Sequence, residues 1–213
     1  MSAITELLPI LLRGLRFTLE LTVVSAVLAL ILAFAAGLGR ISKIWVIRTI
    51  SALYVEIFRG TSLLVQLFWI FFVLPLIGLR LEPFLAGVIG LGCNLGAYGA
   101  EVVRGAILAF PQPQIEAGIA LNMTPFQRMV RIIIPQAWVR ILPPFGNLLI
   151  ELIKSTALAS LITIPELTYQ GYSLRMTTGR TQEVFTLLLV IYFLVAYPFT
   201  RATRWLESRR RWA

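Results

Sequence analysis

The sequence contains no histidine and a single cysteine, Cys93, which lies within an apolar run. A disulfide framework needs paired cysteines, and zinc sites use histidine or cysteine ligands, so the sequence excludes both. It also has no Walker A glycine loop, no HExxH zinc motif and no G-x-S-x-G nucleophile elbow. We therefore expect no catalytic residues, no metal site and no cofactor, and the chain cannot hydrolyse ATP by itself.

Charged residues are scarce, at 14% of the 213 residues, whereas 58% are hydrophobic. Together with a mean hydropathy of +0.85, this composition is typical of an integral membrane protein rather than a soluble domain. The net charge of +9 comes from basic residues that flank apolar runs and do not form a soluble basic domain with interleaved aromatics. We therefore expect one transmembrane domain over residues 1–213 and no nucleic-acid partner.

Long apolar runs predict an all-α, polytopic membrane protein with about five transmembrane helices, because a helix needs roughly 20 residues to cross the hydrocarbon core. After a short amphipathic start, the expected spans are residues 17–38, 54–78, 84–110, 137–164 and 184–200. The third run is rich in glycine, which favours close helix packing and hence a buried helix. The polar segment 165–183 is expected to include a surface helix.

Basic residues predict the orientation of these spans. Arg40, Lys43 and Arg48 follow the first span in a short loop, and a cluster of arginines follows the last span. Loops rich in lysine and arginine stay in the cytoplasm. We therefore expect the N-terminus outside and the C-terminus in the cytoplasm, which also places the polar insert between the third and fourth spans in the cytoplasm.

This insert has signals for two short helices with a defined break. Residues 115–121 form the first helix, and Asn122 follows it as a residue that tolerates the left-handed conformation. Thr124 is suited to the N-cap of the second helix, Pro125 to its first position, and Gln127 completes a capping box. An ordinary cytoplasmic helix-turn-helix connector would carry the same local signals.

The insert, residues 113–135, resembles the cytoplasmic EAA loop of ABC importer permeases. The residues that match that loop are Glu116, Ala117, Phe126, Ile134 and Pro135. Gly118 stands in place of the second alanine, and Asn122 in place of the usual glycine. The resemblance implies that this segment couples the chain to an ATPase, through Glu116, Ala117, Gly118, Leu121 and Asn122.

Two further segments resemble permeases for polar amino acids. The run from Glu56 to Gln66, EIFRGTSLLVQ, is similar to their E-x-x-R-G-T-P-x-x-x-Q pattern, with Ser62 in place of proline, and NLGAYGAEVVRGAI is similar to a second pattern. The resemblance implies the type I, MetI-like permease fold in a bacterial inner membrane. It also implies three kinds of partner: a cytoplasmic ATPase dimer that binds ATP, a second permease subunit and an extracytoplasmic solute-binding protein.

Within that family, the segments FRGTSLLVQLFW, IALNMTPFQRM and PPFGNLLIELIKSTALASLIT most resemble the ectoine and hydroxyectoine permeases. This resemblance implies import of a small zwitterionic solute, either ectoine or hydroxyectoine or otherwise a polar amino acid, by alternating access. A self-sufficient ion-coupled carrier or channel is the alternative, although such carriers often contain inverted repeats and the sequence shows no convincing repeat. A membrane anchor would explain the hydrophobicity but not the capped insert.

Polar residues within the spans are the candidates for the solute path, because a central charge costs roughly 2.5–3.5 kcal/mol on insertion scales. Glu151 and Lys154 lie three apart, so they either neutralise each other or line the path beside Asn147. Gln66 faces the pore or a partner helix, and a structural ion pair is expected between Glu101 and Arg104. The fourth span contains Pro143, Pro144 and Gly146, which predict a kinked or partly unwound helix.

Overall fold

The computed structural model describes residues 2–209, with the side chains of residues 6–205, and all secondary structure in this part of the chain is helical. The expected all-α fold is therefore confirmed. The elements are α1 (Ser2–Arg40), α2 (Trp45–Gly60), α3 (Leu63–Phe68), η1 (Trp69–Val73), η2 (Leu74–Ile77), α4 (Pro83–Leu108), α5 (Gln112–Ala120), α6 (Pro125–Arg128), η3 (Met129–Ile133), α7 (Ile134–Ser155), η4 (Thr156–Ile162), α8 (Leu167–Thr178) and α9 (Thr181–Arg209). The short segments η1 and η3 are π-helical, and η2 and η4 are 3-10 helical.

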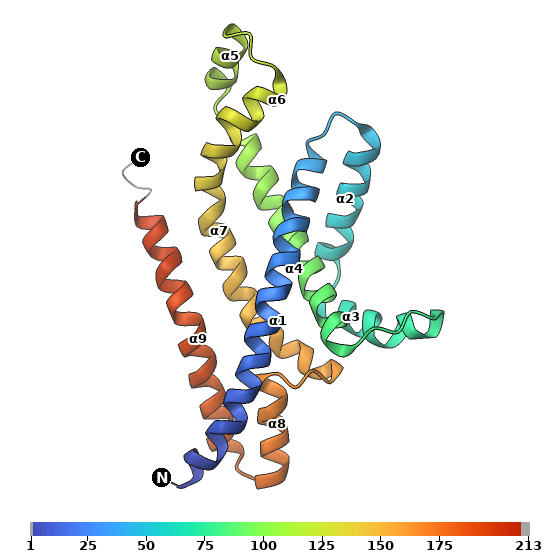
Figure 1. The fold of residues 1–213 in the computed structure, drawn as a ribbon, viewed down its shortest axis with the longest axis vertical. Coiled ribbons are helices and arrows are strands. Elements are labelled where there is room, and N and C mark those ends of the chain that lie inside the picture. The colour runs from blue at the N-terminus through green and yellow to red at the C-terminus, as the bar shows by residue number, and fades with distance from the viewer. Residues whose placement is uncertain (1, 210–213) are drawn as a thin grey trace.

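The long helices run side by side in an elongated bundle (Figure 1). α1 and α4 pack along each other, and α7 lies against both α4 and α9. α5 and α6 form one end of the bundle, whereas α8 and the start of α1 lie at the other end. The segment from α3 to η2 extends sideways, away from the bundle axis.

Four helical segments are long and apolar enough to cross a membrane: Glu6–Arg40, Pro83–Leu108, Pro125–Ile162 and Thr181–Trp205. A fifth candidate is the pair Trp45–Gly60 and Leu63–Ile77, which is bent by 105°. The expectation of about five spans is therefore confirmed. The first span is longer than expected, because the residues before it continue the same helix.

The second span is not the continuous helix expected from residue 54 onward. α2 ends at Gly60, and the next two residues, Thr61 and Ser62, have extended backbone before α3 begins. The Thr61 hydroxyl donates to the carbonyl of Ile57 at 2.7 Å, which satisfies one acceptor freed at the helix end. Irregular backbone at membrane depth persists only where protein covers it or where it faces a cavity. We therefore expect the break at Thr61 and Ser62 to be covered by protein or to face a cavity.

α4 is the central helix of the bundle, as its glycine content predicts. In its apolar window 61% of the residues are buried, against 22% in the corresponding window of α9. A Cβ atom on Gly96 would lie 2.8 Å from both the Leu32 Cβ of α1 and the Tyr54 hydroxyl of α2. The absence of a side chain at this position therefore lets α1 and α2 approach α4 closely.

The fourth span does not unwind at its proline pair. α7 continues as an α-helix through Pro143 and Pro144, and the change to tighter 3-10 turns comes later, from Thr156 onward. Gly146 does not loosen the helix either. A Cβ atom at this position would lie 1.9 Å from the Thr203 Cγ2 of α9, so Gly146 instead permits the close crossing of α7 and α9.

The expected surface helix in the polar segment is α8, which begins at a buried carboxylate. Glu166 is fully buried and caps α8 by accepting a hydrogen bond from the Tyr169 backbone N–H at 2.7 Å. The Tyr192 hydroxyl of α9 donates to Glu166 at 2.9 Å, and the Thr18 hydroxyl of α1 lies 3.4 Å away as a further donor. Burial raises the pKa of Glu166 above its ordinary value, although these hydrogen bonds oppose the shift. The network therefore joins α1, α8 and α9 at this end of the bundle.

Candidate functional site

A polar cavity of about 260 Å³ lies between the α2–α3 break, α4 and the end of α7. Its polar lining residues are Thr61, Ser62, Asn94, Tyr98, Glu151 and Ser155. The local sequence explains why these polar residues line the same cavity. The break brings two hydroxyl residues to the wall, while α4 and α7 each supply a pair of residues spaced four apart, which lie on one helical face.

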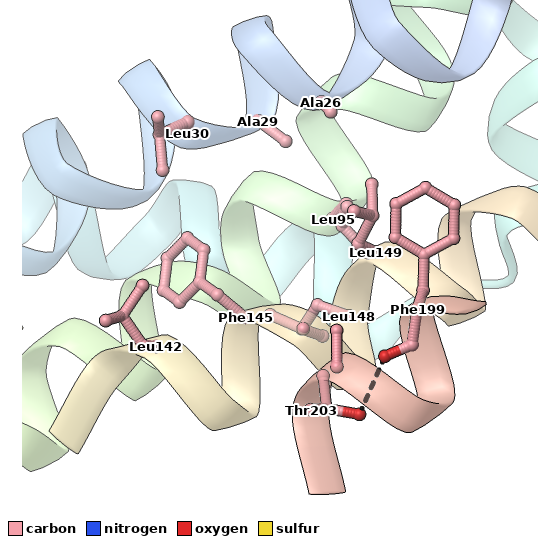
Figure 2. Close-up of a pocket in the computed structure, with 12 residues that line it drawn as sticks. Ala26, Ala29, Leu30, Leu95, Leu142, Phe145, Leu148, Leu149, Phe199 and Thr203 are labelled. Atoms are coloured by element: carbon pink, nitrogen blue, oxygen red, sulfur yellow. Dashed lines mark hydrogen bonds between the residues drawn. The ribbon is translucent and has the colours of Figure 1, made fainter. Parts of the chain in front are cut away.

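A second cavity, of about 340 Å³, lies between α1, α4, α7 and α9 and is lined almost entirely by apolar side chains (Figure 2). Phe145 of α7 and Phe199 of α9 are the largest of them. The hydroxyl of Thr203 is already bonded within α9, because it donates to the Phe199 carbonyl at 3.0 Å. This cavity therefore offers no free polar group to a polar solute, in contrast to the cavity at the break.

Gln66 does not line the polar cavity, but its hydrogen bonds join the two sides of the α2–α3 break. Its amide nitrogen donates to the Phe58 carbonyl at 2.9 Å and to the Thr61 hydroxyl at 2.7 Å. Asn94 donates in turn to the Gln66 amide oxygen and to the Phe58 carbonyl, both at 3.0 Å. Gln66 was expected to face either the pore or a partner helix, and the structure shows it in contact with the helix α4. Asn94 was not anticipated from the sequence.

The structure separates the three polar residues that the sequence placed together on the fourth span. All three side chains are exposed, but only Glu151 lines the polar cavity. Within the part of the chain that the structure describes, no ion pair joins Glu151 to Lys154. The interpretation as a mutually neutralising pair is therefore wrong, because Glu151 faces the cavity at the break and not its neighbour on the helix.

Glu101 is the centre of a cluster of arginines from three helices. Arg104, one turn later on α4, donates to it at 2.9 Å from Nη2, so the expected pair is confirmed. Arg40 of α1 also forms an ion pair with Glu101, and the Arg59 Nη1 of α2 lies 3.8 Å from its second oxygen. The Arg59 guanidinium also stands over the ring of Tyr98, 5.2 Å from its centroid. No local sequence pattern predicts the contributions of Arg40 and Arg59.

The insert at the other end of the bundle forms the two short helices that its sequence predicts. α5 ends before Asn122, which has a positive φ of 55°. The capping box of α6 is complete, since the Gln127 backbone N–H donates to the Thr124 hydroxyl at 3.2 Å and the Gln127 side chain accepts from the Thr124 backbone at 2.9 Å. These bonds fix the start of α6 directly after the break at Asn122.

Most of the predicted coupling residues lie on the surface of this insert. Glu116, Ala117, Leu121 and Asn122 are exposed, and Leu121 retains 75% of its accessible surface. Gly118 is buried, because a Cβ atom there would lie 2.9 Å from the Arg128 Cδ of α6. The insert thus presents a carboxylate beside exposed apolar side chains, a combination that suits docking to another protein.

Residues 25–212 match the family described as "Binding-protein-dependent transport system inner membrane component". The chain belongs to this family. It is 45% identical over 207 residues to a probable amino-acid ABC transporter permease protein, y4tF, of Sinorhizobium fredii, with 94% of this chain and 87% of the relative covered. It is also 43% identical over 202 residues to the L-cystine transport system permease protein TcyB of Bacillus subtilis, covering 94% and 86% of the two chains.

The fold of this permease is similar to that in a structure described as "Crystal structure of an amino acid ABC transporter with histidines". The TM-score is 0.92 at 34% sequence identity, with 98% of this chain and 97% of the other covered. The chain is therefore the permease subunit of an amino-acid ABC importer, a multi-pass inner-membrane component that is not itself an enzyme. Membership of the family implies an ATPase and a solute-binding protein as partners and excludes the self-sufficient carrier or channel.

Proposed function

We propose that this permease carries a small zwitterionic solute through the polar cavity at the α2–α3 break. The observation that carries this proposal is the position of Glu151 in the wall of the cavity that the hydroxyl residues Thr61 and Ser62 also line. An ionised carboxylate within a membrane-spanning segment is costly unless it faces water, a partner or a solute. Glu151 has no ion-pair partner among the described residues, so the ammonium group of a solute supplies the missing charge.

Two observations support different members of this solute class. The relatives described above include an L-cystine permease and a probable amino-acid permease, which favours a polar amino acid. The segments similar to ectoine and hydroxyectoine permeases favour ectoine or hydroxyectoine, and they include seven residues that line the cavity: Thr61, Ser62, Leu63, Glu151, Leu152, Ser155 and Leu158. All of these solutes carry an ammonium or amidinium cation together with a carboxylate, as the proposal requires.

Uptake by the complete transporter tests the proposal. The permease, its ATPase and its binding protein are reconstituted into liposomes, and uptake is measured with labelled L-cystine, L-glutamine, L-arginine and ectoine. We expect ATP-dependent accumulation of at least one solute, and Glu151→Gln should lower it about tenfold or more, since hydrogen bonds to charged groups are the strong ones. The matched control is Lys154→Gln, which removes a nearby charge that does not line the cavity.

Two results would reject this function. The first is background uptake of all four solutes by the wild-type complex. The second is wild-type uptake by Glu151→Gln, which would place the solute path elsewhere in the molecule. The ranking of the four solutes then decides between ectoine and an amino acid.

We also propose that α5 docks into a groove on the ATPase, which binds the ATP, and that the N-terminus lies outside so that α5 and α6 face the cytoplasm. Exposed Glu116 and Leu121 support this docking role. A second permease subunit, identical or homologous, completes the pore. Support for it comes from the sideways segment α3–η2, whose exposed side chains include Val65, Phe68, Trp69, Phe72 and Leu76. The mass of the purified complex tests this stoichiometry, since two permease chains are expected for each ATPase dimer.

A further inference from the structure

The polar cavity holds a carboxylate in its wall but no cation. Glu151 is the one charged side chain among the described residues that line it. A zwitterionic solute brings its own carboxylate, which needs a positive partner as it leaves water. Lys154, the partner expected from the sequence, does not line the cavity. Among the described residues of this chain, a cation for this role therefore has to come from outside the cavity wall.

Arg59 occupies that position. It lies in the last turn of α2, directly before the break whose residues Thr61 and Ser62 form part of the wall. Its guanidinium stands over the ring of Tyr98, 5.2 Å from the centroid, and Tyr98 itself lines the cavity. A single aromatic side chain thus connects Arg59 to the solute cavity.

Of the three arginines around Glu101, Arg59 has the longest ion-pair distance to its carboxylate. Its Nη1 lies 3.8 Å from Glu101 Oε2, whereas the Nη2 of Arg104 lies 2.9 Å from the same oxygen. The other oxygen, Oε1, accepts hydrogen bonds from Arg40 and from the Arg104 Nε. If Arg59 moves away, both oxygens of Glu101 therefore keep a donor, and no buried carboxylate is left without a partner.

The exposed fractions of the three arginine side chains also single out Arg59, which has the longest contact with Glu101. The Arg59 side chain retains 41% of its accessible surface, against 21% for Arg40 and 33% for Arg104. Three guanidinium groups surround one carboxylate, so the cluster has excess positive charge even when Glu101 is ionised. Such an excess favours the approach of an anion to the most accessible and least engaged arginine.

We propose that Arg59 is the anion-binding residue of the solute path. Its guanidinium leaves the loose contact with Glu101 and binds the carboxylate of a solute whose cationic group lies at Glu151. This inference rests on the proposed function, that is, on passage of the solute through this cavity. Two parallel hydrogen bonds from a guanidinium to a carboxylate are strong and specific in geometry. The permease thereby selects solutes with a carboxylate over their neutral amides.

The test measures that selection directly. The purified permease–ATPase complex, without binding protein, is incubated with whichever labelled solute the wild type accumulates from L-cystine, L-glutamine, L-arginine and ectoine. The carboxamide derivative of the same solute competes for binding. We expect the wild type to prefer the carboxylate about tenfold or more, and Arg59→Gln to lose this preference.

Arg104→Gln is the matched control, because it removes a firmer ligand of Glu101 that does not contact Tyr98. It should keep the preference for carboxylate. An unchanged preference in Arg59→Gln would overturn the inference, and so would an equal loss in Arg104→Gln, since Arg59 would then act only through the cluster. If Arg59→Gln does not assemble, Arg59→Lys serves in its place: a reduced preference supports the inference and an unchanged one refutes it.

Failure of the proposed function gives a different result. A wild-type complex that accumulates none of the four solutes would reject the function and this inference together, before any variant is measured. A wild-type complex that transports a solute without any preference for its carboxylate would reject only the role of Arg59.

Discussion

Asn94 of α4 donates a 3.0 Å hydrogen bond to the side-chain oxygen of Gln66 in α3, and both amides donate to the carbonyl of Phe58 in α2. The amide pair therefore joins the two halves of the broken span to the central helix. Gln66→Leu would remove the hydrogen bonds from Gln66 to Phe58 and Thr61 and the one that Gln66 accepts from Asn94, although Asn94 would keep the Phe58 carbonyl as an acceptor. Each lost hydrogen bond costs about 0.5–1.5 kcal/mol, so we expect a lower unfolding temperature of the purified complex and weaker uptake. Gln182→Leu, at an exposed position of α9, is the control and should change neither quantity.

A second prediction concerns the crossing of α7 and α9. Gly146→Ala introduces a Cβ atom 1.9 Å from the Thr203 Cγ2, so the helices must separate, and overpacking of this kind costs about 1–3 kcal/mol. Adding Thr203→Ala removes the obstructing methyl group and should restore most of the unfolding temperature. Gly105→Ala is the control, because no atom lies within 4 Å of the Cβ that it would introduce. A double variant no more stable than Gly146→Ala alone would contradict this account.

A third prediction concerns coupling to the ATPase. Glu116→Lys reverses the exposed charge on α5, and we expect solute-stimulated ATP hydrolysis to fall about tenfold or more if the carboxylate meets basic groups or N–H donors on the ATPase. Glu6→Lys makes the same change at an exposed position at the opposite end of the bundle and should have no effect. Co-purification with the ATPase shows whether the loss arises from assembly or from coupling. Normal assembly and normal hydrolysis in Glu116→Lys would refute the docking role.

The angle between α5 and α6 depends on the left-handed backbone at Asn122, whose φ is 55°. Asn122→Gly should retain solute-stimulated ATP hydrolysis, because glycine adopts this conformation without steric cost. Asn122→Val should lower it, since a left-handed backbone costs an ordinary residue about 1–2 kcal/mol and a β-branched one more. Equal rates in the two variants would show that the angle does not matter for coupling.

A further prediction concerns pH and follows from the buried carboxylate of Glu166. Burial raises the pKa of Glu166 in the folded protein above the unfolded value of about 4.3. The folded state therefore binds the proton more tightly, and the stability that this provides is present below the unfolded pKa and lost as pH rises through the folded one. Glu166→Gln should remove this loss.

The measurement is the unfolding temperature of the complex between about pH 4.5 and about pH 7, a range that begins near the unfolded pKa of glutamate. Glu183→Gln is the control, because Glu183 is exposed and paired only loosely, at 3.9 Å, with Arg180. Parallel curves for the wild type and Glu166→Gln would show that Glu166 does not titrate in this range.

The sequence predicted the features that depend on neighbours along the chain. The capping box of Thr124 and Gln127 and the positive φ of Asn122 follow from residues within a single turn, and both are present. Apolar run length likewise predicted the number of spans, because the thickness of the hydrocarbon core fixes the length required.

Features that depend on packing were not predictable in the same way. Hydropathy does not distinguish a straight span from one bent at Thr61, since it reports composition and not backbone conformation. Spacing alone does not show whether Glu151 faces Lys154 or a cavity. The ion pairs of Arg40 and Arg59 with Glu101 join three helices, and only the assembled bundle brings these residues together.

The 105° bend after α2 also limits how far this helix extends before the chain changes direction. α2 has 16 residues and so extends about 24 Å, less than the hydrocarbon core of about 30 Å. α2 by itself is therefore too short to cross the hydrocarbon core, and the hydroxyl residues Thr61 and Ser62 follow at its end, where the chain turns sideways. On the path proposed above, a solute at the end of α2 would therefore meet hydroxyl groups in place of hydrocarbon.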